Sequence, residues 1–226
     1  MISWLPQALG ADAAARSWAD VAKWPDFQGG IWVRERGPQS AESTPVYVPG
    51  VARALAARGP IDPSTLGSST CEPQEGPFER TGEFFYSKDA IFIMMDEDYL
   101  SVRHIYLDGR VHGDPDPSYY GHSIGHWEGD TLVVDTIGFL PQVWIAPYVP
   151  GQGATHSVER IRLIAPDTLE QRVTLTNPQV LQQPWTRTQR FKLRRDLHVQ
   201  EAFCSQNNRD LPVNGQPSLD LSAPRS

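Results

Sequence analysis

The sequence predicts an all-β protein, namely an antiparallel up-and-down barrel, lipocalin-like in architecture, of about eight to ten strands with a short N-terminal helix and long loops. Three observations predict it. Short runs of β-branched and aromatic residues recur from Gly82 onward, turn-forming residues separate them, and no stretch has the length of a crossover helix. Sequential strands joined by short turns form a meander, and closing the meander removes its exposed edges.

The chain divides into three parts. We expect an N-terminal helical segment at 1–24, one barrel domain at 25–208 and a loose tail at 209–226. Trp4 and Leu9 belong to an apolar stripe of the first segment, as in an amphipathic helix. The tail is rich in proline and serine, a composition typical of segments that do not pack.

The expected strands follow from runs of β-forming residues between turn signals. They lie within 25–36 and at Glu83–Ser87, Ala90–Asp96, Ser101–Leu107, 122–128, 131–136, Thr155–Ile164, Thr168–Thr176, Trp185–Leu193 and Val199–Cys204. Segment 37–80 is rich in proline, glycine and serine, which predicts a long wrapping loop with one helical patch at Val51–Arg58. Segment Ile137–Ala154 reads as a lid-like loop, and Asp108-Gly109 is a two-residue hairpin signal.

The central hairpin turns at Gly129-Asp130, a pair suited to a tight two-residue loop. Alternation then places mostly apolar residues on one face, and His122, His126 and Asp135 on the other. We expect Asp135 to lie diagonal to both imidazoles, at the ~7–8 Å spacing from which longer side chains still touch. A carboxylate between two histidines on a rigid hairpin is the most chemically suggestive feature of the chain.

Polar residues also fall on the expected inner face of the last strands. Glu159, Gln171, Arg187 and Gln189 alternate in step with aliphatic residues. Buried polar groups cost several kcal/mol unless they are paired, which favours a cavity that holds water or ligand and into which ionisable groups point. The alternative is a bulge that resets the register and turns these residues outward. A barrel of this size can enclose one small ligand.

Charge and hydropathy limit the partners. The net charge of −7 argues against nucleic acid, whose phosphates need a basic surface. No apolar stretch approaches the ~20 residues that span a bilayer, and the first residues lack a secretory signal. We expect a cytoplasmic protein, or a periplasmic one if its start was truncated. Cys71 and Cys204 are either a disulfide or two free thiols, depending on the compartment.

Metal and cofactor chemistry have weak support. His122 and His126 would lie about 13 Å apart on a strand, too far to share one ion. His112, Asp114 and Asp116 could hold a cation from a loop, but a solvated acidic turn is the commoner explanation. Phosphate loops, dinucleotide fingerprints and nucleophile elbows do not occur in the sequence. We expect neither a required metal nor a cofactor.

The hairpin and its flanks resemble a known family. The motif is Gly-His-Ser-Ile-Gly-His-Trp-Glu-Gly-Asp-Thr-Leu-Val-Val-Asp-Thr, preceded by Ile-Tyr-Leu-Asp-Gly-Arg and followed by His-Ser-Val-Glu-Arg. It resembles a large bacterial family, common in proteobacteria, most of whose members have no assigned function. The resemblance runs from about Phe27 to Asn208 and includes the Cys71-Glu-Pro and Cys204-Ser-Gln-Asn-Asn blocks.

This resemblance carries a functional expectation. One branch of the family looks like cofactor-independent lyases that remove formaldehyde from lignin-derived aryl-propane or phenylcoumaran compounds. His122 and Asp135 match the family pattern, whereas relatives usually have arginine at the position of His126. Many relatives also look exported, whereas this chain lacks a signal.

General acid–base catalysis is the chemistry that the residues favour. We expect His122, held by Asp135, and Glu159 to transfer protons, and Tyr106 to act as the acid. Each has a structural alternative: a bracing His–Asp bond, a buried ion pair of Glu159 with Arg187, or a tyrosine at the edge of the core. The expected substrate-binding residues are Arg103, Tyr120, Trp127, Trp144, His156, Trp185 and Arg187.

Three functional classes remain open at this point. The first is a lyase for an apolar aromatic small molecule, without nucleic-acid or membrane partners. The second is a lipocalin-like carrier without turnover, and the third is a partner-binding module with a filled barrel. A homodimer is the base-rate expectation for a bacterial protein of this size.

Overall fold

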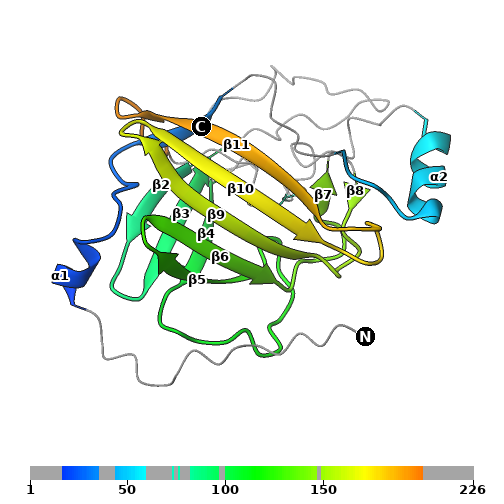
Figure 1. Cartoon of the computed structure of the whole chain (residues 1–226), viewed down its shortest axis with the longest axis horizontal. Coiled ribbons are helices and arrows are strands. Elements are labelled where there is room, and N and C mark those ends of the chain that lie inside the picture. The colour runs from blue at the N-terminus through cyan, green and yellow to red at the C-terminus, as the bar shows by residue number, and fades with distance from the viewer. Residues whose placement is uncertain are drawn as a thin grey trace, which may run out of the picture.

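Nine strands close into a barrel, which confirms the predicted all-β barrel fold (Figure 1). The structure is a computed structural model, and it describes residues 17–35, 44–59, 73, 76, 82–96, 100–146 and 149–200. Around the barrel the strand order is β1-β11-β10-β9-β6-β5-β4-β3-β2.

The barrel strands have these bounds: β1 Ile31–Arg34, β2 Gly82–Tyr86, β3 Ala90–Asp96, β4 Leu100–Tyr106, β5 His122–Glu128, β6 Thr131–Ile137, β9 His156–Ala165, β10 Thr168–Thr176 and β11 Trp185–Arg194. Two short strands, β7 Trp144–Ala146 and β8 Val149–Pro150, pair in a separate small sheet within the expected lid-like loop. Helix α1 spans Trp18–Val21 and helix α2 spans Pro49–Ala57, at opposite ends of the barrel in Figure 1.

One strand pair departs from the predicted antiparallel meander. β4 and β5 run parallel, with Ile105 opposite Ser123 and Tyr106 opposite Ile124. The Asp108-Gly109 turn therefore does not make a hairpin. Instead the chain continues through residues 107–121, the strap, which passes over the barrel at the bottom of Figure 1 before β5 begins. Parallel neighbours need such a crossover, of about a dozen residues or more.

The central hairpin has the predicted register. Glu128 pairs with Thr131 and Ile124 pairs with Asp135, and Gly129 takes the positive φ of 62° that the turn requires. The apolar face points into the barrel, so its other face, with His122 and Asp135, lies on the outer surface. The ionisable groups that point into the barrel therefore do not include these two.

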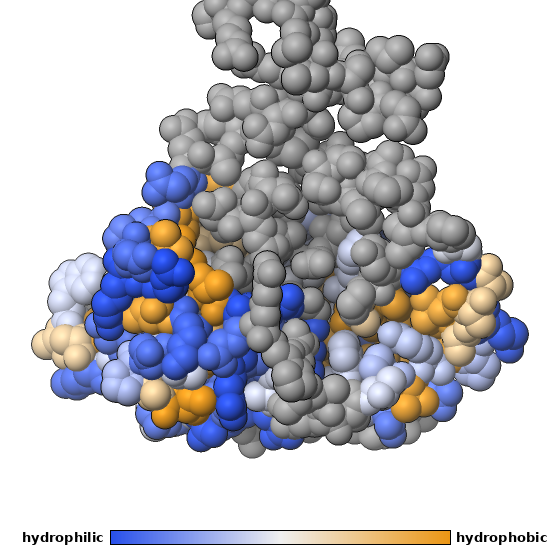
Figure 2. All heavy atoms as spheres, turned by 90° about the horizontal axis from the view of Figure 1, so that it is seen from above, coloured by the Kyte–Doolittle hydropathy of each residue, from blue (hydrophilic) through white to orange (hydrophobic). Residues whose placement is uncertain are grey.

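Two apolar clusters fill the described interior. The larger packs Phe27 and Trp32 against the inner faces of most barrel strands, and the smaller surrounds Phe139 and Trp185 beside β7 and β8. An interior cavity bounded by Trp32, Phe84 and Gln171 measures about 30 Å³, the room of about one water. On the described part of the face in Figure 2, small hydrophobic patches are separated by hydrophilic residues.

Several expectations concern residues outside the described ranges. They include most of segment 1–24, Cys71, Cys204, Tyr148 of the lid-like loop and the tail at 209–226. Val199 and Gln200 of the last expected strand are not in a strand, and the rest of that strand is not described.

The strap ends at Gly121, whose geometry only glycine fits. Its φ is +64°, and a Cβ there would lie 2.6 Å from the carbonyl oxygen of Ile137. We expect Gly121→Ala to lower the free energy of unfolding by about 2–3 kcal/mol, measured by urea denaturation. Gly109→Ala is the matched control, because φ there is +81° but nothing lies within 4 Å. Equal losses in the two variants would rule out the close approach at Gly121.

Candidate functional site

Three imidazoles and one carboxylate form a hydrogen-bonded chain on the outer face of the barrel. We call His112, His122, Asp135 and His156 the histidine cluster. Nδ1 of His112 lies 2.8 Å from Nδ1 of His122, and its Nε2 lies 2.8 Å from Oδ1 of Asp135. Nε2 of His156 lies 2.9 Å from Oδ2 of the same carboxylate.

Neighbouring strands bring three of these residues together. His122 begins β5, Asp135 lies on β6 and His156 begins β9. Asp135 pairs directly with Val158, which puts His156 in the diagonal position two residues away on the same face. The fourth residue, His112, comes from the strap and inserts between His122 and Asp135.

Hydrogen-bond counting fixes the proton positions in the neutral cluster. An ionised carboxylate only accepts, so His112 and His156 both donate from Nε2. Nδ1 of a neutral His112 then carries no proton and accepts from Nδ1–H of His122. It follows that Nε2 of His122 is unprotonated, which leaves it as the nitrogen that can take a proton.

The pKa shifts agree with this assignment. Burial alone would raise the pKa of Asp135, but the hydrogen bonds from His112 and His156 outweigh burial and hold the pKa well below its usual range. Burial, followed by the neighbouring His112, lowers the pKa of His122 below the ordinary histidine value of 6.5. Near neutral pH, Asp135 is therefore an anion and His122 a neutral base.

A row of rings in contact, of which Tyr106 and His122 are stacked, leads across the outer face to the cluster. Ring centroids lie 4.5 Å apart for Phe92 and His104, 3.8 Å for His104 and Tyr106, and 5.2 Å for Tyr106 and His122. The guanidinium of Arg110 lies 3.6 Å over the Tyr106 ring and pairs with Asp108. These contacts hold Tyr106 flat beside His122.

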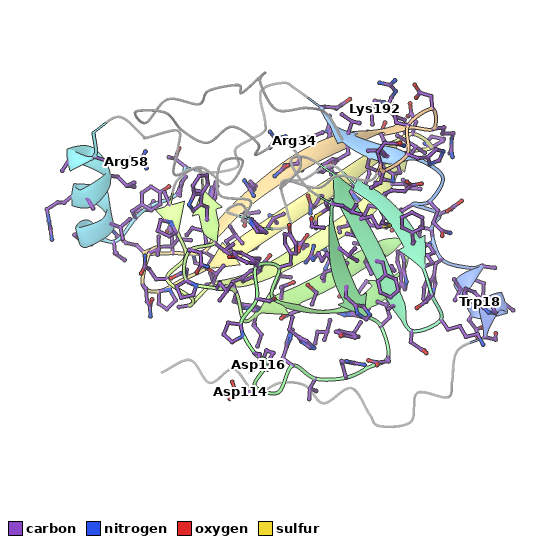
Figure 3. The ribbon with its side chains drawn as sticks, turned by 180° about the vertical axis from the view of Figure 1, so that it is seen from behind. Trp18, Arg34, Arg58, Asp114, Asp116 and Lys192 are labelled. Atoms are coloured by element: carbon purple, nitrogen blue, oxygen red, sulfur yellow. The ribbon has the colours of Figure 1, made fainter. Side chains whose placement is uncertain are left out.

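Two pockets share Tyr106 as a wall. The His122 pocket measures about 480 Å³ and has His104, Tyr119 and Tyr120 among its lining residues. The His112 pocket measures about 580 Å³ and includes His112, Asp135 and Ile124. Both lie under the strap, whose Asp114 and Asp116 are labelled at the bottom of Figure 3. Each pocket is within the size range of small-molecule sites.

A second polar network lies inside the barrel. Arg103 extends from β4 past Ser123 and Thr136 to Glu159, with guanidinium–carboxylate distances of 3.1 and 2.5 Å. Gln171 donates to the same carboxylate at 2.7 Å. Arg103 and Glu159 are 1 % and 0 % exposed, so they form a fully buried ion pair. The inward direction predicted for Glu159 and Gln171 is confirmed, but the partner of Glu159 is Arg103 and not Arg187.

The remaining predicted binding residues lie apart from the histidine cluster. Trp127 packs against Trp24 and Phe27 in the larger core. Trp185 belongs to the smaller core, and the buried Arg187 lies 5.3 Å over its ring. Trp144 is in β7. Of the seven predicted binding residues, Tyr120 and His156 are the two near the histidine cluster.

The partner predicted for Asp135 needs a correction. Its two oxygens bind His112 and His156, and His122 reaches it only through His112. His126 instead pairs with Glu128. Sequence reasoning placed His112 in an acidic turn and so missed its role. The one available signal was a histidine in a loop directly before the motif.

The described residues contain no group of three or more His, Cys, Asp or Glu side chains arranged to hold a metal ion. Among the same residues, no helix is long and apolar enough to cross a membrane. Comparison with protein-family models and with curated proteins gives no match to this chain.

Proposed function

We propose that this protein is a cofactor-independent lyase that removes formaldehyde from an aromatic, lignin-derived small molecule by acid–base catalysis at the histidine cluster. One observation carries the proposal. His122 lines a pocket with aromatic walls, and its hydrogen bond to His112 leaves its other ring nitrogen able to take a proton. The family resemblance supplies the reaction type.

The reaction is redox-neutral and needs no co-reactant. Nε2 of His122 takes the proton of a primary hydroxyl, and the O–H electron pair forms the C=O bond of formaldehyde. The carbon–carbon bond to that group breaks, and its electrons form a new C=C bond. The benzylic C–O bond breaks in the same step, because the benzylic carbon must release one bond as it gains the C=C bond, and the departing oxygen receives a proton.

Tyr106 is the proposed acid for this last step. It lines both pockets and stacks on His122, so an oxygen leaving a substrate that contacts His122 is within its reach. Glu159 has no proton transfer in this scheme, because hydrogen bonds from Arg103 and Gln171 already engage both its oxygens inside the barrel.

Replacing His122 tests the proposal. We expect His122→Gln to slow formaldehyde release from a phenylcoumaran about 100-fold, because general-base catalysis contributes about 10²–10⁴. The measurement is formaldehyde formed per unit time. His198→Gln is the control, since His198 is 61 % exposed and pairs with Glu83 on β2, away from both pockets. An unchanged rate in His122→Gln would reject the assigned base.

A carrier without turnover is the alternative. The interior cavity of about 30 Å³ is too small for an aromatic ring, so a carrier would use the two outer pockets. Such a protein binds the aromatic compound in a calorimetric titration but releases no formaldehyde. That pair of results would replace the lyase proposal with the carrier.

A further inference from the structure

We propose that His112 is a proton relay that takes the Nδ1 proton of His122 while Asp135 holds it, so that two imidazoles act as one base. The proposal rests on the lyase function for its role in turnover. Its structural basis is the 2.8 Å contact between the two Nδ1 atoms, together with the 2.8 Å contact from His112 to Asp135. Hydrogen bonds use both nitrogens of His112, whereas Nε2 of His122 remains able to take a proton.

The Nδ1–Nδ1 contact requires one shared proton. Two protonated nitrogens would repel each other, and two unprotonated ones would place lone pair against lone pair. When Nε2 of His122 receives the substrate proton, the Nδ1 proton of His122 can pass to Nδ1 of His112. One N–H bond breaks and one forms, and the hydrogen bond between the rings persists in the opposite direction.

This transfer moves the positive charge from His122 to His112, where it is more stable. His122 becomes neutral again, with its proton on Nε2, and His112 becomes an imidazolium that still donates to Asp135. The charge then lies in direct contact with the Asp135 carboxylate, whereas on His122 its hydrogen-bond partner is a neutral imidazole. When the product oxygen takes its proton, directly or through Tyr106, the same steps run in reverse and restore the neutral cluster.

His112 is not needed to fasten the strap. The backbone N–H of Leu107 donates to Asp89, the N–H of Ser118 donates to Gly138, and the N–H of Leu140 donates back to Ser118. These bonds hold both ends of the strap to the barrel without any imidazole. If His112 only anchored the strap, its hydrogen bond to Asp135 would be enough. Its contact with His122 would then not be required.

Other ionisable groups surround the relay. On the strap side they are Asp108 and Arg110; on β4 they are His104 and Tyr106; on β6 and β9 they are Asp135 and His156. Arg110 pairs with Asp108, and Asp135 is the carboxylate in direct contact with an imidazole of the pair. The arrangement therefore favours His112 over His122 as the place for the first added proton.

Nitrogen-15 NMR of the wild-type protein tests this order of protonation. As pH falls, we expect both nitrogens of His112 to become protonated first, while His122 stays neutral and moves its proton to Nε2. The first added proton should change the nitrogen signals of both rings together, because it belongs to the pair and not to one residue. If the first proton stays on His122 and His112 remains neutral, the relay is overturned.

A kinetic comparison gives a second test. Glutamine at position 112 can still donate to Asp135 but cannot accept and pass a proton, so His112→Gln should lower kcat about tenfold or more with little change in KM. His156→Gln, which leaves the His122–His112 pair intact, should lower kcat less. Equal losses in both variants would contradict the relay, whereas absence of formaldehyde release by the wild type would instead reject the lyase function.

Discussion

Replacing Arg103 with methionine is expected to lower the free energy of unfolding by about 3–5 kcal/mol. Glu159 would remain in the barrel with no exposed surface and without the two hydrogen bonds that its carboxylate receives from the guanidinium. An unpaired charge in such a place has no solvent to compensate for the lost partner. Urea denaturation at neutral pH measures the loss.

A second variant separates the buried charge from the lost packing. In Arg103→Met with Glu159→Gln, the charge is gone, Gln171 can still donate to an amide oxygen, and Ser123 and Thr136 still bond each other at 2.9 Å. We expect at least half of the lost stability to return, which appears as a coupling energy in a double-mutant cycle.

An exposed pair supplies the matched control. Arg162 is 53 % exposed and bonds Glu170 at 2.8 Å. Arg162→Met should cost about 1 kcal/mol or less, because water screens a surface pair. If Arg103→Met lowers the free energy of unfolding no more than Arg162→Met does, Glu159 is solvated or neutral in the folded protein.

The interior network shows what the alternation of residues along a strand can predict and what it cannot. A period of two placed Glu159 and Gln171 inside the barrel, and the Gly129-Asp130 turn gave the hairpin register, because each follows from local geometry. The partner of Glu159 depends instead on how far a side chain reaches across β5 and β6. No local pattern distinguishes Arg103 from Arg187 in that respect.

The histidine cluster shows that a local pattern cannot predict a contact that depends on long-range strand pairing. Asp135 and His122 were found because they lie on one hairpin, but His112 enters from the strap. Its position depends on the parallel pairing of β4 with β5, which the Asp108-Gly109 hairpin signal argues against. A long-range pairing therefore overrides a local turn preference, and the residue that joins the two predicted groups becomes visible only in the folded chain.

Asp135→Asn should have the largest effect on turnover, a fall in kcat of about 10³–10⁴, comparable to loss of the carboxylate in a catalytic triad. In the wild-type protein, the two oxygens of Asp135 accept hydrogen bonds from two imidazoles. The amide has one oxygen, and its NH₂ group would face a donor unless one imidazole changes its tautomer. The charge that stabilises a protonated His112 is lost as well. Formaldehyde release measures the fall, and the exposed Asp114→Asn is the control.

The same substitution should change how stability depends on pH. The folded-state pKa of Asp135 is depressed, so its contribution is present above the unfolded value near 3.8 and is lost as pH falls toward the folded pKa. Because the pKa of His122 is also lowered, the free energy of unfolding decreases further as pH falls below 6.5. Asp135→Asn should therefore be less stable at pH 7 by about 1–2 kcal/mol, after allowance for screening at a partly exposed site.

The decline of stability below pH 5 separates the contribution of Asp135 from that of His122. Without the carboxylate, the decline between pH 5 and pH 3 should become shallower than in the wild type, because one fewer group takes up a proton on unfolding there. Unfolding free energies at several pH values measure that slope. A parallel curve, merely shifted downward, would show that Asp135 is not held ionised by its two imidazoles. The turnover loss would then come from packing and not from the charge.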